Sequence, residues 1–98
     1  MGLGDADAEI EIYREPDFRP GTRVRAKKLV KNDGTVGGRE IGEILVKKGD
    51  EGYVRDVGTY LQRHYVYAVE FLTSGNIVGM LGRELVSAET AERKERAP

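Results

Sequence analysis

Few side chains in this 98-residue sequence have the types and spacing that catalysis requires. His64 is the single histidine and there is no cysteine, so neither a histidine pair nor thiolates can hold a metal, and a thiolate nucleophile is excluded. Ser74 and Ser87 lie outside any motif that presents a serine nucleophile. The adjacent carboxylates Asp50 and Glu51 lie close to two lysines in the sequence, and we interpret them as solvated surface carboxylates. We therefore expect no enzymatic activity, no catalytic residue, no metal and no cofactor.

A glycine-rich stretch, VKKGDEGYVRDVGTYLQ at residues 46–62, raises the question of a phosphate-binding loop. It lacks the Gly-Lys-Ser/Thr ending of a P-loop, and no G-x-G-x-x-G motif precedes a predicted helix. The two acidic residues between Gly49 and Gly52 would also repel a phosphate at that point. We interpret Gly49 and Gly52 as backbone devices that start a strongly coiled strand, and Gly58 as the residue that ends it.

Hydrophobic alternation predicts short β-strands and no long amphipathic helix between them. The clearest strand alternates aromatic and apolar residues at period two. The predicted strands are 22–29, 41–47, 52–57, 65–72 and 77–80, with a 3₁₀ turn or a last short strand at 83–86. About five short strands in roughly 70 residues predict an all-β fold, a small SH3-like (KOW-like) antiparallel barrel. The residues that we assign to its core are Val54, Val57, Tyr67, Val69 and Phe71.

The charge distribution divides the chain into three parts. Residues 1–17 carry six carboxylates and one arginine, and we expect an acidic, disordered tail there. Residues 18–86 carry twelve basic and eight acidic side chains and form the predicted barrel. Residues 87–98 are charged and have almost no apolar stripe, so we expect a flexible tail or a frayed helix.

Other features of the sequence concern its location in the cell. No apolar run approaches the roughly 20 residues that a membrane span needs, and the first residues are acidic where a targeting peptide is basic. The lack of cysteine is typical of a reducing compartment. We expect a cytoplasmic protein that does not contact a membrane.

Two binding surfaces are consistent with the residues. One is a nucleic-acid surface, in which a basic strand face is combined with exposed aromatic rings; its members are Arg23, Arg25, Lys27, Tyr53, Tyr60 and Tyr65. The small net basic charge of residues 18–86 argues against it. The other is a protein-binding surface on the predicted loop 59–64, where Tyr60 and Leu61 either anchor a partner or close one end of the barrel.

Four segments of the sequence together resemble the NifZ family of nitrogen-fixation proteins. They are NDGT at residues 32–35, GEILVKKGDEGYVRDVGTYLQ at 42–62, YVYAVEF at 65–71 and VGMLGREL at 78–85. The resemblance covers roughly residues 18–86, and the long ordered run that ends in TYLQ makes it specific. Neither tail takes part in it.

The resemblance implies an accessory, chaperone-like factor in the maturation of the molybdenum–iron protein of nitrogenase, acting where its P-clusters form. Its partner would be the immature molybdenum–iron protein, with other assembly factors as further candidates, and contact would be transient. For the contact surface we predict Arg55, Asp56, Thr59, Tyr60 and Gln62. A KOW-like RNA-binding module stays open as the alternative, although we expect no nucleic-acid partner.

Overall fold

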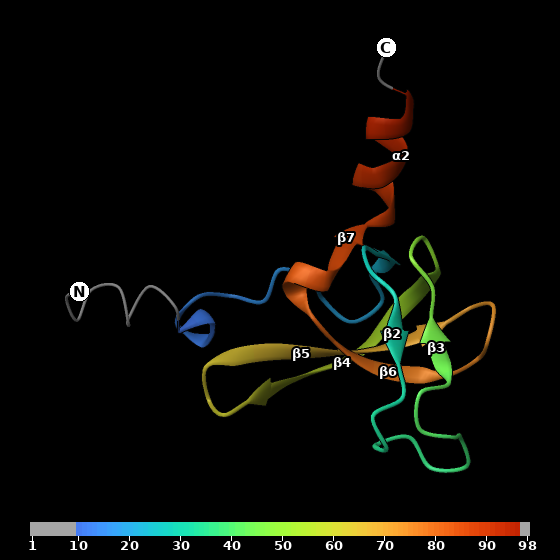
Figure 1. Cartoon of the computed structure of the whole chain (residues 1–98). Helices are drawn as coiled ribbons and strands as arrows, with labels where there is room; N and C mark the ends of the chain where they lie inside the picture. Colours follow the sequence, from blue (N-terminus) through green and yellow to red (C-terminus); the bar gives the residue numbers. More distant parts are fainter. Residues whose placement is uncertain (1–9, 97–98) are drawn as a thin grey trace, which may run out of the picture.

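The computed structural model describes residues 10–96 of the chain, and this part is mostly β-structure (Figure 1). A 3₁₀ turn precedes the strands, and a second 3₁₀ turn and a helix follow near the C-terminal end. The elements are η1 (Glu11–Tyr13), β1 (Arg23–Ala26), β2 (Val30–Lys31), β3 (Ile44–Val46), β4 (Glu51–Tyr60), β5 (His64–Phe71), β6 (Ile77–Leu81), η2 (Gly82–Glu84), β7 (Leu85–Ser87) and α2 (Ala88–Arg96).

The strands form two antiparallel sheets that do not close into a barrel. Five strands make the larger sheet in the order β6-β5-β4-β1-β7, and β2 pairs with β3 in a separate two-stranded sheet. β6 and β7 are therefore the edges of the larger sheet. The predicted antiparallel β-structure is confirmed, although the chain also contains the helix α2. The predicted barrel is wrong, because β2 and β3 pair only with each other. The SH3-like and KOW-like assignments stay predictions.

The strand boundaries differ from the predicted ones mainly in β4. β5 and β6 agree with the predicted strands to within one residue at each end, and β1 and β3 are shorter than predicted. β4 continues three residues beyond the predicted end at Val57. The sequence did not indicate β2, which has only two residues and a register shift between them. The segment 83–86 contains both structures that we considered, since η2 leads directly into β7.

The core lies between the two sheets and around the middle of β5. Tyr67, Val69 and Phe71 alternate along β5 and are at most 1% exposed, as the period-two pattern predicted. Val54 is equally buried, and Val57 is half-buried against the core. The other core residues are Val24, Ala26, Leu45, Val46, Val78, Met80 and Leu85.

Gly52 is the glycine that the packing of the sheet requires. A Cβ built on it would lie 2.4 Å from the carbonyl oxygen of Glu70 on β5, a distance that real Cβ atoms do not show. Gly49 precedes β4 with a φ of +95°, which favours glycine. Both glycines are needed for the backbone at the start of β4, as predicted. Gly58 is different, because it pairs with Val66 inside the strand and does not end it.

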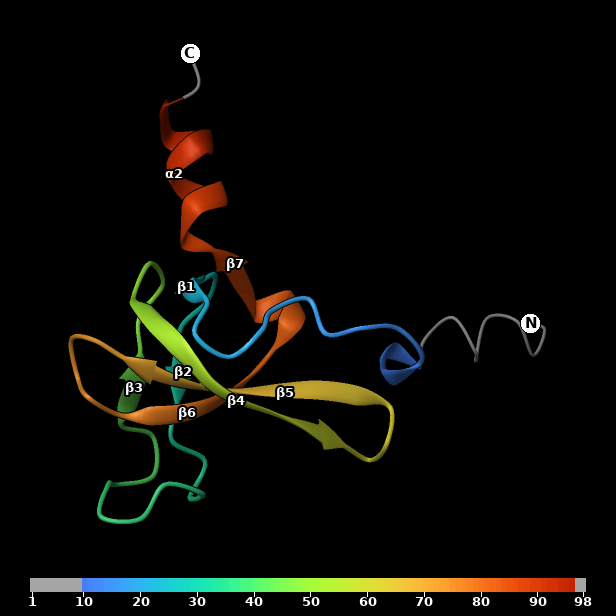
Figure 2. The ribbon, with the colours of Figure 1, turned by 180° about the vertical axis from the view of Figure 1, so that it is seen from behind.

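The two ends of the chain were predicted as tails. Residues 1–9 and 97–98 lie outside the part that the structure describes. Residues 10–17 were predicted to be disordered, but they pack beside β5, with the backbone N–H of Asp17 donating to the hydroxyl of Tyr67 at 2.8 Å. At the other end the helical alternative is observed: α2 extends from β7 and buries Ala88 and Ala91. Figure 2 shows α2 and the N-terminal segment leaving the sheet in different directions.

Candidate partner-binding surface

β4 and β5 form a long hairpin whose outer half extends away from the rest of the sheet (Figures 1 and 2). We call this outer half, residues 56–68, the hairpin arm. It begins at a β-bulge, where the register shifts between Val54 and Asp56. Beyond the bulge the two strands pair continuously from Asp56 with Ala68 to Tyr60 with His64. A bulge increases the local twist of a strand, which is consistent with the change of direction at this point.

The residues predicted for partner binding lie along the β4 side of this hairpin. Arg55 occupies the bulge, and its guanidinium forms an ion pair with Glu70 at 3.1 Å while remaining 63% exposed. The carboxylate of Asp56 accepts a hydrogen bond from the N–H of Val57 at 2.9 Å. Thr59 is exposed near the end of β4, and Tyr60, the last residue of that strand, is 56% exposed. The structure therefore places these four residues on one continuous exposed strand.

Gln62, the fifth predicted residue, lies in the turn at the tip of the arm. The predicted loop 59–64 is wrong, because Thr59 and Tyr60 still belong to β4 and His64 already belongs to β5. The turn is closed by a hydrogen bond from the N–H of Arg63 to the carbonyl of Tyr60 at 3.1 Å.

Sequence reasoning missed this tight turn because it contains none of the residues that usually form one. Leu61 and Gln62 have φ values of +52° and +54°. That region favours glycine and asparagine, and hairpins of this kind are normally recognised by those residues. Leu61 is 72% exposed at the same tip, so the alternative that it closes one end of a barrel is not what the structure shows.

The N-terminal segment covers the β5 edge of the arm. The carboxylate of Glu11 accepts a hydrogen bond from the N–H of Tyr65 at 2.7 Å, and the N–H of Ile12 donates to the carbonyl of Arg63 at 3.3 Å. The hydroxyl of Tyr65 donates to the carbonyl of Arg14 at 2.6 Å. Little in the sequence indicated this contact, since alternation in the segment is limited to a few residues (IEIY).

The basic face of β1, the surface considered for nucleic acid, is neutralised within the protein. Arg23 forms ion pairs with Glu51 and with Glu92 of α2. Arg25 forms ion pairs with Glu51 and with Glu95 of α2, both at 2.9 Å. Hydrogen bonds that the guanidinium groups donate to these carboxylates raise the pKa of both arginines, that of Arg23 mainly through Glu92 and that of Arg25 mainly through Glu95.

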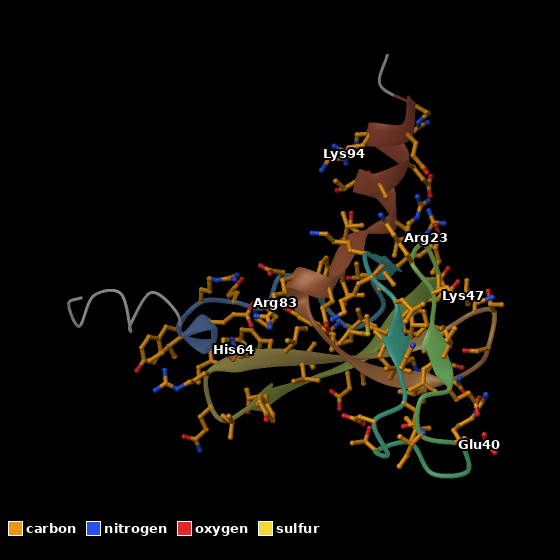
Figure 3. All side chains as sticks on the ribbon, viewed as in Figure 1. Arg23, Glu40, Lys47, His64, Arg83 and Lys94 are labelled. Atoms are coloured by element: carbon orange, nitrogen blue, oxygen red, sulfur yellow. The ribbon has the colours of Figure 1, made fainter. Side chains whose placement is uncertain are left out.

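Of the three tyrosines of that candidate surface, Tyr53 lies beside β1, where it pairs with Arg23. The other two lie on the arm: Tyr60 pairs with His64, and the ring of Tyr65 lies 6.5 Å from that of Tyr67. Figure 3 shows Arg23 near the base of α2 and His64 on the arm, well apart from each other. The structure therefore does not bring all three rings and the basic residues together into one stacking surface.

Two hollows lie next to these features. One, of about 430 Å³, is lined by Gly21, Tyr53, Val54 and Arg55, at the point where the arm leaves the sheet. The other, of about 550 Å³, lies between β1 and α2. The residues that line it are Arg25, Ala26, Lys27, Lys48, Gly49, Val86 and Glu95.

Neither metal ligands nor a membrane span is found among residues 10–96. No group of three or more histidine, aspartate or glutamate side chains in that range is arranged to hold a metal ion. No helix in the same range is long and apolar enough to cross a membrane.

Comparison with known proteins gives a consistent family. The NifZ domain matches residues 15–87. The chain is 61% identical to a probable NifZ protein of Rhodobacter capsulatus over 76% of this chain and 95% of that protein. It is 58% identical to a putative NifZ protein of Sinorhizobium fredii over 89% of this chain and 80% of that one.

The chain matches only part of a longer relative. NifZ of Azotobacter vinelandii is 44% identical over 74% of this chain, which spans about half of that protein's length (46%). No solved structure matches the chain. The domain match and the identity to relatives of which the match covers 95% and 80% show that the chain belongs to the NifZ family.

Proposed function

We propose that this chain is an accessory, chaperone-like factor that assists P-cluster formation in the molybdenum–iron protein of nitrogenase through transient contact with the immature protein. NifZ proteins are associated with nitrogen fixation. The observation that supports a contact role is the hairpin arm, a long exposed projection that carries aromatic and arginine side chains at its base and tip. The proposed site of action is the cytoplasm, and the proposed activity is binding without catalysis.

The amino-acid composition restricts how such a factor can act. Since the sequence has no cysteine, it cannot hold an iron–sulfur cluster through thiolates. A role in cluster formation then operates on the conformation of the client, for example by keeping a subunit surface accessible while cluster fragments join. Binding of that kind must be reversible, which is consistent with a small contact area.

Arg55, at the base of the arm, and Tyr60, near its tip, are the two proposed anchors. Arginine and tyrosine are enriched among the residues that dominate binding energy, and the two side chains stand 63% and 56% exposed. Asp56, Thr59 and Gln62 complete the proposed surface, as the polar residues around the anchors.

The alternative of RNA binding is disfavoured by one observation. Both arginines on the β1 face, Arg23 and Arg25, are paired with carboxylates that would compete with phosphate groups. An RNA ligand would have to displace Glu92 and Glu95 before it could reach them. Among the described residues, the one ion pair that involves residues 55–60 of β4 joins Arg55 to Glu70.

A binding experiment with the full chain tests the proposal. The immature molybdenum–iron protein is purified from a diazotroph that lacks this protein, and its affinity for the chain is measured. The double variant Arg55→Ala/Tyr60→Ala should bind at least tenfold more weakly, which corresponds to about 1.4 kcal/mol. The double variant Ile41→Ala/Arg93→Ala removes another exposed apolar side chain and another arginine, and serves as the matched control.

Two results would contradict the proposal in different ways. If the wild-type chain does not bind the immature protein but binds a single-stranded RNA in a salt-dependent manner, the RNA-binding alternative is correct. If both double variants bind the client as the wild type does, the client contact exists but lies elsewhere than on the arm.

A further inference from the structure

Strand β4 loses one of its two neighbours where the arm begins. β1 pairs with β4 from Glu51 to Tyr53, and the chain before β1 continues this contact to Val54. The N–H of Gly21 donates to the carbonyl of Val54 at 2.7 Å, and the N–H of Val54 donates to the carbonyl of Thr22 at 2.9 Å. From Asp56 to Tyr60, β5 is the only strand in the described part of the chain that pairs with β4.

The backbone groups that face this free edge can be identified. In an antiparallel pair, opposite residues alternate between those that bond to each other and those whose N–H and C=O point away. The N–H of Tyr65 points away from β4, because it donates to Glu11. Its partner Thr59 therefore directs its own N–H and C=O toward the free edge, and so does Val57, two residues earlier. The N–H of Val57 already donates to the carboxylate of Asp56 at 2.9 Å, so Val57 offers its C=O to a partner.

The two edges of the arm differ in whether another segment covers them. The β5 edge is covered by the N-terminal segment through Glu11 and Ile12. The β4 edge, from Val57 to Tyr60, reads Val-Gly-Thr-Tyr and contains neither a charged residue nor a proline. Natural proteins usually protect an exposed edge with one of these or with a covering segment. An unprotected edge of this kind is a template for an additional strand.

Gly58, in the middle of this edge, has no explanation in the fold itself. Its φ is not positive, and a Cβ built there would meet no atom within 4 Å. Gly52 on the same strand is required by the backbone of β5, but Gly58 is not. Its missing side chain leaves the sheet surface beside Val66 open, so that a large side chain on an adjacent strand can lie across it.

We propose that the edge Val57–Tyr60 binds an extended segment of the client as an additional β-strand. The N–H and C=O of Thr59 and the C=O of Val57 form the backbone hydrogen bonds, and an aromatic or large aliphatic residue of the client covers Gly58. At about 3.3 Å per residue, the edge accommodates four to five client residues. This inference rests on the proposed function and specifies how the client is recognised.

The charges at the ends of the edge define the rest of the client segment. Arg63 lies in the turn that follows the edge, whereas Arg55, which precedes it, forms an ion pair with Glu70. The hollow lined by Gly21, Tyr53 and Arg55 lies where the added strand would leave the arm. A segment with an uncharged centre and an acidic residue at the end beside Arg63 is therefore favoured over a basic one.

The variant Thr59→Pro tests backbone pairing directly. Proline removes the N–H of residue 59, which bonds to no other described residue, so the internal ladder of the arm is retained. Thr59→Val keeps the N–H and is the matched control. With the immature molybdenum–iron protein as the probe, Thr59→Pro should bind at least tenfold more weakly, and Thr59→Val should bind within twofold of the wild type.

A second pair of variants tests the role of Gly58 and does not depend on proline. Gly58→Val fills the open surface with a residue that favours strands, and should fold normally but bind the client at least fivefold more weakly. Gly37→Val, at another glycine with open surroundings and without positive φ, is its control. Thermal unfolding of every variant verifies that the fold is intact.

Hydrogen exchange on the wild-type complex decides whether pairing occurs. The amide proton of Thr59 should exchange at least tenfold more slowly when the client is bound. If the client binds and this amide stays unprotected, or if Thr59→Pro folds and binds as the wild type does, strand addition is wrong while the proposed function stands. If the wild-type chain does not bind the client at all, the proposed function and this inference are both wrong.

Discussion

The carboxylate of Glu11 accepts a hydrogen bond from the backbone N–H of Tyr65, at 2.7 Å and across 54 positions of the sequence. Glu11 takes the place that a neighbouring strand would occupy at this edge of β5, because β6 ends opposite Val66. It is also held by Arg14 at 3.2 Å, which in turn pairs with Asp17. The N-terminal segment is thus part of the folded structure and determines which edge of the hairpin arm remains free.

Replacing Glu11 should uncover the second edge of the arm. In Glu11→Ala the N–H of Tyr65 loses its acceptor, and a hydrogen bond to a partly buried charged group contributes about 1.5–3 kcal/mol. We expect a loss of about 1–2 kcal/mol in the free energy of unfolding, measured with urea, since water can replace part of the bond. The amide of Tyr65 should also exchange faster. Glu15→Ala, an exposed carboxylate of the same segment, should change neither quantity.

Asn32 should be essential for the loop between β2 and β3. Its side-chain nitrogen lies 3.1–3.2 Å from the carbonyl oxygens of Val36, Arg39 and Glu40. Its oxygen accepts hydrogen bonds from two backbone N–H groups of the same loop, and the residue is only 2% exposed. Asn32→Ala leaves several of these groups without a partner, so we expect a loss of about 2–3 kcal/mol by urea unfolding.

Asn32→Asp and Asp33→Ala are informative companions to that variant. A carboxylate cannot donate to the loop carbonyls, so Asn32→Asp should be destabilised at neutral pH at least as much as Asn32→Ala. Asp33 is exposed, and its carboxylate bonds only to nearby Thr35 among the described residues. Its replacement by alanine should stay within about 0.5 kcal/mol of the wild type. Equal stability of all three variants would contradict the role assigned to Asn32.

Gly52 and Gly58 lie on the same strand and should respond oppositely to alanine. The Cβ of Gly52→Ala would overlap the backbone of Glu70 and Phe71, and because backbone cannot move aside cheaply, we expect a cost of about 3 kcal/mol or more. Gly58→Ala meets open space and should be neutral or slightly stabilising. Thermal unfolding of the two variants measures the difference, and a stable Gly52→Ala protein would show that the pairing of β4 with β5 is different.

Tyr67 should make the protein sensitive to alkaline pH. Burial of its phenol raises its pKa above the usual 10, because the charged phenolate is poorly solvated there. The folded state therefore binds the proton more tightly than the unfolded state. This stabilisation is fully present below pH 10 and is lost as the pH rises through the pKa of the folded state.

The variant Tyr67→Phe isolates that effect. It loses the hydrogen bond from the N–H of Asp17, so it should be about 1 kcal/mol less stable than the wild type at pH 8. The difference should shrink at pH 11, where the wild type has also lost the contribution of its neutral phenol. Urea unfolding at both pH values provides the comparison, and a difference that grows with pH would contradict the expectation.

The sequence by itself determined most of the strands and the part of the core that β4 and β5 contribute. Strict alternation in β5 predicted that Tyr67, Val69 and Phe71 face inward, and the structure confirms it. Such a pattern is local, since side chains at period two must lie on one face of any strand. The sequence also predicted the backbone role of Gly49 and Gly52 from their position beside a coiled strand.

The tertiary structure decided which surfaces remain available for a partner. The basic face of β1 is a feature of the sequence, but its neutralisation depends on Glu92 and Glu95, nearly 70 residues away. The length of β4 and the tight turn at Leu61 follow from pairing with β5, which the residues of the turn do not signal. Long-range pairing of this kind depends on partners that no local pattern contains. For the same reason only the fold shows that one edge of the hairpin arm is covered by Glu11 and the other is free.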